Sequence, residues 1–278
     1  MIRPVALASF ALLLPAAALA QSGPPLKTAV DGTFAPHAMP KMSGGVEGFN
    51  VDLAEEIGKR LKRPITVDAA QYSVLVPALQ AGTYDFLAAP TTVTKERTES
   101  MLFSEGYLNT DFQFLTLKDA PEITKLEDLK GKTISVNKGS AYDAWARELE
   151  PKIGWIVESY GTQPDAVAAV MAGRAYANVA GNTVVAWAAK NNPRVKTSFL
   201  HATGLVWALP FRKDSAELRK QVENAVECMK TDGTLARIHE KWFGAKPAAG
   251  SAAATVFPGY GVPGMAGHDP AEHAPSCS

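Results

Sequence analysis

Hydroxyl and guanidinium side chains are concentrated in the segment Thr91-Thr-Val-Thr-Lys-Glu-Arg97. Thr94 suits a helix N-cap, because its hydroxyl accepts a backbone N–H that the first turn leaves unpaired. Glu96 suits the positive end of that helix, whereas Arg97 opposes the helix dipole and requires compensation. Hydroxyls, free backbone N–H groups and a guanidinium at one helix start would form a carboxylate receptor. The alternative is an arginine that reaches to water or pairs with a nearby glutamate, and the segment alone favours neither reading.

The elements that would position this segment alternate between strand and helix patterns. The apolar run 85–89 predicts a buried strand that leads into the threonines. Further strands are predicted at 26–30, 64–68, 133–136, 155–157, 176–180 and 205–209, helices at 51–61, 73–81, 140–147, 164–172, 215–230 and 233–242, and a hairpin-type excursion at 39–45. This alternation predicts an α/β fold with mainly parallel sheets flanked by helices. The pattern restarts after Leu117, and we expect the two resulting units to face a shared cleft beyond their strand ends.

The segment 1–20 has the pattern of a secretory signal peptide. Arg3 supplies the positive region, residues 5–20 are almost wholly apolar and small, and Ala18-Leu19-Ala20 fits the cleavage site. No cysteine follows that site, so a lipid anchor is not expected. The mature protein is therefore predicted to be exported and unanchored, which means periplasmic in a bacterium with two membranes. The formal net charge of zero argues against nucleic-acid partners and polybasic membrane binding.

The C-terminal segment 245–278 is rich in Ala, Gly and Pro and has neither a helical nor a strand period, which predicts a disordered or loosely draped tail. Its Cys277 can pair with Cys228 in an oxidising compartment. The alternative is that Cys228 is a small buried apolar residue and Cys277 is free, and sequence spacing does not decide between them. His268, His273 and Cys277 match no zinc-binding pattern, so a solvated tail is favoured over a metal site.

Six fragments, in this order and at these spacings, resemble family-3 periplasmic solute-binding proteins, which serve ABC importers of polar amino acids. The fragments are Glu47-Gly-Phe-Asn-Val-Asp-Leu53, Leu75-Val-Pro-Ala-Leu79, Thr92-Val-Thr-Lys-Glu-Arg97, Phe103-Ser104, Leu126-Glu-Asp-Leu-Lys-Gly131 and Asp232-Gly-Thr-Leu235. Each fragment alone is weak, whereas their combination is specific. The resemblance spans about Leu26 to Gly244 and leaves the tail outside.

The resemblance implies the type II periplasmic-binding-protein fold, in which two α/β lobes joined by two crossing strands close on a ligand by hinge motion. Lobe 1 would comprise 26–110 and 206–244, and lobe 2 would comprise 111–205. The crossings would fall near 108–112 and 204–207. The resemblance also implies a monomer without cofactor or metal, whose partners are a small carboxylate ligand and an ABC permease in the inner membrane.

Site residues follow from the resemblance position by position. Arg97 matches the arginine that clamps the ligand carboxylate, and Thr92 matches a hydroxyl donor to the same group. Pro90 stands where many relatives have a serine and has no N–H, so one usual donor is lost. The remaining matched positions are a second serine position at Ala89, the ligand-covering aromatics Phe34 and Tyr72, the distal carboxylate Asp31, and the lobe-2 loop residues Asn137, Ser140 and Ala141.

One departure from the family pattern concerns the ligand ammonium. Relatives that bind α-amino acids usually carry an aspartate at the lobe-2 strand end, where this chain has Gly181 followed by Asn182. Tyr176 likewise replaces the usual aspartate at the start of that strand. An unpaired buried ammonium is costly. Either another residue supplies the counter-charge, or the ligand is not a plain α-amino acid.

Three functions fit this scaffold, and the leading one is a transport receptor for an amino acid, an amino-acid derivative or another organic acid. The second is a dehydratase acting on cyclohexadienyl acids such as arogenate, which would need a general acid in the cleft. His37 and His201 are candidates to approach the cleft, although a lone histidine is more often structural. The third is a sensor module, against which the low-complexity C-terminal tail argues, since family sensors are usually fused to a membrane span.

Overall fold

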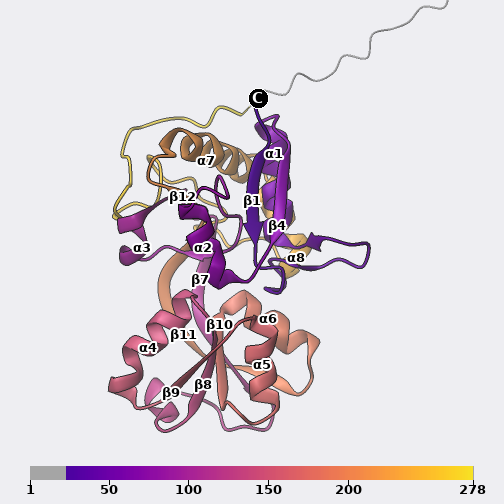
Figure 1. The fold of residues 1–278 in the computed structure, drawn as a ribbon, viewed down its shortest axis with the longest axis vertical. Coiled ribbons are helices and arrows are strands. Elements are labelled where there is room, and N and C mark those ends of the chain that lie inside the picture. The colour runs from indigo at the N-terminus through magenta and orange to yellow at the C-terminus, as the bar shows by residue number, and fades with distance from the viewer. Residues whose placement is uncertain (1–22, 278) are drawn as a thin grey trace, which may run out of the picture.

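Two bodies of helices and strands lie end to end, joined by strands β7 (Leu108–Leu117) and β11 (Val195–Ala208) (Figure 1). The computed structural model describes residues 23–277, so the predicted signal peptide lies outside them. We call the body that holds both ends of this range lobe 1, and the body that holds β8 to β10 lobe 2. The two connecting strands pair antiparallel, with Leu108 opposite Trp207, within the ranges that the resemblance implies for the crossing. The two-lobed α/β prediction is confirmed.

Lobe 1 is built on the parallel strands β1 and β4, which pair from Leu26 opposite Ile65 to Val30 opposite Ala69. Helices α1 and α8 lie on one side of this pair, and α2 runs from it toward lobe 2 (Figure 1). The excursion at 39–45 is the predicted hairpin. The elements of this lobe are β1 (Leu26–Val30), β2 (Met39–Pro40), β3 (Val46–Glu47), α1 (Phe49–Arg60), β4 (Ile65–Ala69), α2 (Tyr72–Gln80), β5 (Thr91–Thr92), α3 (Lys95–Ser100), β6 (Met101–Phe103), β12 (Pro210–Arg212), α7 (Ala216–Thr231) and α8 (Thr234–Phe243).

The apolar run 85–89 is buried but is not the regular strand that its composition predicts. Phe86 forms one isolated bridge with Phe211. The N–H groups of Ala88 and Ala89 both donate to the carbonyl of Ala29, at 3.1 and 2.9 Å. The backbone groups of this run are thus divided between two neighbours, which breaks the ladder and turns the chain toward the threonines.

Lobe 2 contains a mixed sheet instead of a mainly parallel one. In the strand order β5-β11-β7-β10-β8-β9, only β10–β8 and β8–β9 pair parallel. The pairings of β7 and β11 are antiparallel, because these strands carry the chain into the lobe and back out of it. The other elements of this lobe are η1 (Leu126–Leu129), β8 (Thr133–Asn137), α4 (Ala141–Ile153), β9 (Ile156–Tyr160), α5 (Gln163–Met171), β10 (Ala177–Gly181) and α6 (Asn182–Asn191).

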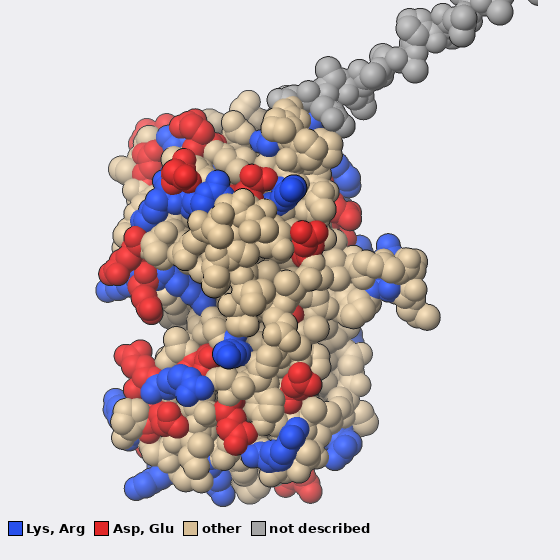
Figure 2. All heavy atoms as spheres, viewed as in Figure 1, with Lys and Arg blue, Asp and Glu red and all other residues tan. Residues whose placement is uncertain are grey.

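Positive and negative side chains are interspersed over both lobes on the face shown in Figure 2, in keeping with the zero net charge. Within residues 23–277, no helix combines the length and the apolar character that a membrane crossing requires.

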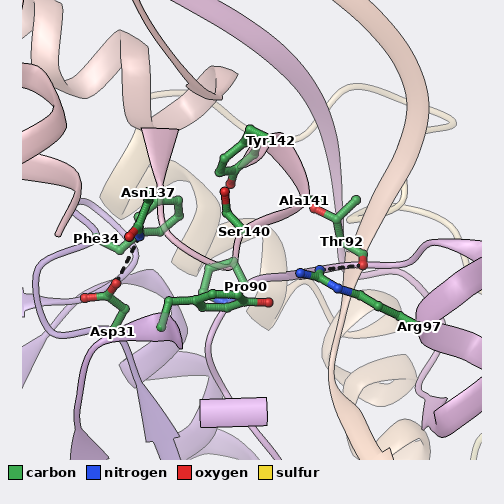
Figure 3. Close-up of a pocket in the computed structure, with 10 residues that line it drawn as sticks. Asp31, Phe34, Pro90, Thr92, Arg97, Asn137, Ser140, Ala141 and Tyr142 are labelled. Carbon is green, nitrogen blue, oxygen red and sulfur yellow. Dashed lines mark hydrogen bonds between the residues drawn. The ribbon is translucent and has the colours of Figure 1, made fainter. Parts of the chain in front are cut away.

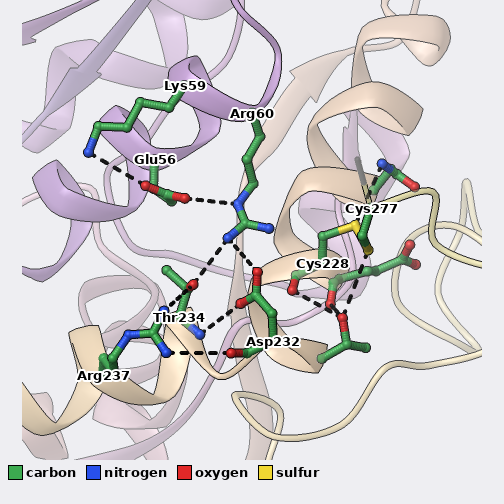
Figure 4. Close-up of polar contacts among 11 residues, drawn as sticks. Glu56, Lys59, Arg60, Cys228, Asp232, Thr234, Arg237 and Cys277 are labelled. Atoms are coloured by element: carbon green, nitrogen blue, oxygen red, sulfur yellow. Dashed lines mark hydrogen bonds and ion pairs between the residues drawn. A yellow bond between two sulfur atoms is a disulfide. The ribbon is translucent and has the colours of Figure 1, made fainter.

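The segment 245–277 is fixed to lobe 1, so the prediction of a disordered or loosely draped tail is wrong. It forms no helix or strand, and it runs around α7 (Figure 1). A disulfide joins Cys277 to Cys228 of α7, with their Cα atoms 5.5 Å apart (Figure 4). Of the two alternatives that the sequence leaves open, the cysteines are therefore paired and not free. Lys230 of α7 pairs with Glu105 at 2.6 Å and donates to the carbonyl of Thr255 in the tail. The composition of the tail does not reveal the disulfide or the Lys230 contacts, because each depends on one particular side chain.

Candidate functional site

A pocket between the lobes collects most of the side chains that the sequence singles out (Figure 3). Its walls come from the β1–β2 loop, the start of α2 and the segment from Pro90 to Arg97 in lobe 1, and from the end of β8 and the start of α4 in lobe 2. The lining residues are Asp31, Phe34, Tyr72, Pro90, Thr92, Arg97, Asn137, Ser140, Ala141 and Tyr142. Nine of these ten are predicted site residues, and Tyr142 is the addition.

Arg97 is held in the first turn of α3 by backbone groups. The Thr94 hydroxyl caps the helix by accepting from the Arg97 N–H at 3.3 Å, which confirms the predicted N-cap. The guanidinium donates through Nη1 to the Thr92 carbonyl at 3.0 Å and through Nη2 to the Gly139 carbonyl of lobe 2 at 3.2 Å. No ion pair among residues 23–277 includes Arg97; besides these carbonyls, its guanidinium faces the Tyr72 ring, 5.8 Å from the centroid. The alternative of a glutamate partner is therefore wrong.

Thr92 is oriented by Trp207, a residue to which the sequence assigned no role beyond the crossing strand. The two residues stand opposite each other in the β5–β11 ladder, and the indole Nε1 donates to the Thr92 Oγ1 at 3.1 Å. Both side chains are buried. Because the hydroxyl oxygen accepts from the indole, its own hydrogen is directed elsewhere, and it is available to an oxygen in the pocket.

The remaining predicted positions, Ala89, Gly181 and Asn182, do not line the pocket. The Ala89 carbonyl accepts from the Thr91 hydroxyl at 2.9 Å. A Cβ on Gly181 would lie 2.5 Å from the Trp207 ring, so the indole fills the space into which a side chain at this strand end would project. Asn182 lies in a separate groove between α6 and α8, with Trp187 and Trp242.

Asp31 and Asn137 meet across the pocket from opposite lobes (Figure 3). The Asp31 Oδ1 accepts from the backbone N–H and the hydroxyl of Thr33, at 3.0 and 2.7 Å. Its Oδ2 accepts from the Asn137 Nδ2 at 3.2 Å. The Asn137 Oδ1 is buried and has no hydrogen-bond partner within the described part of the chain. This end of the pocket thus presents acceptors.

The start of α4 forms the lobe-2 wall. Ser140 is the N-cap, and its hydroxyl accepts from the Asp143 N–H at 3.1 Å. Ala141 and Tyr142 occupy the first helical positions, where N–H groups lack partners within the helix. Burial raises the pKa of Tyr142, which keeps the phenol neutral. Helical periodicity would have marked Tyr142 as a buried position, but it does not separate a pocket wall from the core.

The model of bacterial extracellular solute-binding proteins, family 3, matches residues 26–245. The chain belongs to this family. Among its relatives, a probable amino-acid-binding protein, YxeM, of Bacillus subtilis is 32% identical over 73% of this chain and 78% of its own. The lysine/arginine/ornithine-binding periplasmic protein of Escherichia coli is 27% identical over 78% of this chain and 87% of its own. A solved ancestral arginine-binding protein bound to arginine has a TM-score of 0.76 and 32% identity, covering 79% of this chain and 98% of that one.

This family-3 protein has its lobes close together in the structure. The space left in the pocket for the centres of water-sized molecules is about 10 Å³, which is about enough for one water molecule. Besides Arg97 with Gly139 and Asp31 with Asn137, His37 of lobe 1 contacts Thr183 of lobe 2. His201, the other histidine that was a candidate to approach the cleft, does not line the pocket. It packs on Trp145, with ring centroids 5.0 Å apart. The tail from 246 onward lies outside the family match.

Proposed function

We propose that this chain is the substrate-binding receptor of an ABC importer and captures a small carboxylate-bearing solute, an amino acid or an amino-acid derivative. The observation that carries this proposal is Arg97, a partly buried guanidinium that lines the inter-lobe pocket and has no carboxylate partner among residues 23–277. A planar carboxylate is the group that a guanidinium binds best, through two parallel hydrogen bonds.

The other pocket groups complete this binding mode. The Thr92 hydroxyl would donate to the same carboxylate, and the N–H groups at the start of α4 would face it from lobe 2. Phe34 and Tyr72, both buried pocket walls, would cover the apolar part of the solute. Closing the lobes excludes water, and the lower local dielectric strengthens each charged contact.

Relatives supply the setting of this function. Those named above are amino-acid-binding proteins, one of them periplasmic. We extend this setting to the present chain as a monomeric periplasmic receptor, exported by the segment 1–20, that delivers solute to an inner-membrane permease. The proposal includes no cofactor, metal or nucleic acid.

The test is ligand-induced thermal stabilisation and calorimetry of the purified mature protein with amino acids, their derivatives and small organic acids. We expect Arg97→Ala to lose at least about tenfold in affinity, because charge-assisted hydrogen bonds are worth more than about 1.5 kcal/mol each. Arg174→Ala, which removes an exposed arginine from lobe 2, is the matched control and should bind normally. Unchanged affinity of Arg97→Ala for a ligand of the parent protein would refute the assignment.

Dehydratase chemistry is not supported by these side chains. Both oxygens of Asp31 accept hydrogen bonds, so the side chain acts in this structure as an acceptor. Burial lowers the pKa of His37 to about 3, so its imidazole is neutral, and both ring nitrogens have protein partners. We expect no turnover of prephenate or arogenate by the purified protein.

A further inference from the structure

The pocket carries one positive and one negative side chain, and they lie at opposite ends. Figure 3 shows Arg97 on one side and Asp31 on the other, with Pro90 between them. They are the only charged residues among those that line the pocket. Neither takes part in an ion pair within residues 23–277. A solute that satisfies both ends must therefore carry an anionic group and a separate cationic group.

The Asp31 end needs hydrogen-bond donors. The Asp31 Oδ2 receives a single hydrogen bond, from Asn137, a residue that is 1% exposed. That bond fixes the orientation of the amide, because the reversed amide would place two acceptors against each other. The Asn137 Oδ1 is consequently the unpartnered oxygen, and leaving it unsatisfied is unfavourable. An ammonium or guanidinium group would donate to both residues.

The Arg97 end has no acceptor as strong as the Asp31 carboxylate among the residues that line the pocket. A carboxylate cannot project from Gly181, because even a Cβ there would lie 2.5 Å from the Trp207 ring. The carbonyls of Thr92 and Ala89 already accept from Arg97 and Thr91. An ammonium attached to the carbon next to the bound carboxylate would thus be held near a guanidinium with no protein carboxylate beside it, which disfavours binding.

Resting on the function proposed above, we infer that the preferred solutes are carboxylates whose cationic nitrogen is separated from the carboxylate by an apolar chain. This class comprises ω-amino and ω-guanidino acids and basic amino acids with a blocked α-amino group. The carboxylate binds Arg97 and Thr92, and the cation binds Asp31 and Asn137. Phe34 and Tyr72 cover the chain between them. Trp207 is the residue that excludes the α-ammonium partner.

Paired ligands with and without a free α-ammonium test this inference, and the first two pairs are isomers of the same size. The pairs are ε-aminohexanoate with norleucine, δ-aminopentanoate with norvaline, γ-guanidinobutanoate with arginine, and Nα-acetyl-lysine with lysine. In each pair we expect the first compound to bind at least about tenfold more tightly and to give the larger thermal shift. α-Amino acids that bind as tightly as the first compound of each pair would overturn the inference and leave the Arg97 proposal standing. No binding by any of these carboxylates, nor by hexanoate, would overturn both.

Asp31→Asn separates charge recognition from a structural role. We expect this variant to lose its preference for ε-aminohexanoate over hexanoate while still binding hexanoate, since the Arg97 end is unchanged. Asn137→Asp, which adds a carboxylate at the same end, should increase the preference for cationic ligands or leave it intact. An Asp31→Asn variant that keeps the full preference would overturn the inference. The melting temperature of each variant without ligand controls for misfolding.

Discussion

The imidazole of His37 in lobe 1 and the hydroxyl of Thr183 in lobe 2 lie 2.8 Å apart and join the lobes beside the pocket. Asn50 determines the direction of this bond. Its Nδ2 donates to the Ala88 carbonyl and to the Tyr107 hydroxyl, so its Oδ1 must accept from the His37 Nδ1 at 2.9 Å. The neutral ring then accepts at Nε2, and Thr183 donates. The bond thus forms when the lobes are close, and it has this direction when His37 is neutral.

Thr183→Val should weaken solute binding without affecting either lobe. The valine keeps the shape but removes the donor, and one neutral hydrogen bond contributes about 1 kcal/mol, or about fivefold in the apparent dissociation constant. Thr183→Ser, which keeps the hydroxyl, is the matched control. Calorimetric titration of both variants with solute measures the difference. Equal affinities of Thr183→Val and Thr183→Ser would show that the bond does not contribute to closure.

Low pH should destabilise the folded protein through His37. Burial lowers its pKa to about 3 in the folded state, against 6.5 for the ordinary group. The unfolded chain therefore binds the additional proton as the pH falls below 6.5, and the free energy of unfolding decreases by about 1.4 kcal/mol per pH unit down to about pH 3.

This pH dependence is best measured as a difference between the parent protein and His37→Gln by urea denaturation. Glu223 contributes the opposite slope, because burial raises its pKa to about 8, and its contribution to stability is lost as the pH rises from 4.5 to about 8. That contribution is common to both proteins and cancels. Parallel stability curves below pH 6.5 would contradict the assignment to His37.

Gly181→Ala should destabilise the protein by about 1–3 kcal/mol, which is typical of overpacking a buried site. The new methyl group would overlap the Trp207 ring. Trp207→Phe, which shortens the side chain, should reduce the cost of the alanine, so a double-mutant cycle of unfolding free energies should show coupling. Additive effects would mean that the two residues do not compete for this space.

Cys277→Ser should lower the free energy of unfolding by about 3–4 kcal/mol. The disulfide closes a loop between positions separated by 49 residues, and such a cross-link restricts the unfolded chain. Thermal unfolding with and without a thiol reductant measures the effect, and the reductant should shift the parent protein only. Solute affinity should not change, since the contacts of the tail within residues 23–277 that we identify lie on lobe 1, as with Glu105 and Lys230.

The pocket could be located because local residue types and the family resemblance agree. Thr94 and Arg97 lie three residues apart at one helix start. Their types predicted the cap and left the role of Arg97 open, and the resemblance supplied the clamp and the other pocket positions. Trp207 was not predicted as a pocket residue, because strand periodicity identifies β11 but does not show which side chain crosses to another strand end. The contact between Trp207 and Gly181 joins positions that only the folded chain brings together.

The tail was misjudged for a different physical reason. A segment without periodicity is expected to lack order, since it cannot bury an apolar face of its own. Here the order comes from α7, which provides buried partners at successive turns. Glu223 accepts from the Gly261 N–H at 2.6 Å, and Glu227 pairs with His273 at 2.9 Å. Glu223 and Glu227 are buried on α7, and the tail contacts them there.

Trp207 also gives this protein an optical property. Its indole N–H is bonded to the hydroxyl that we expect to contact the solute, and its ring lies edge-on to Phe34 and 4.7 Å from His37. Indole emission responds to nearby charge and to hydrogen bonding. The intrinsic fluorescence of Trp207, isolated by replacing the other four of the five tryptophans with phenylalanine, should therefore report occupancy and lobe closure in real time without any attached dye.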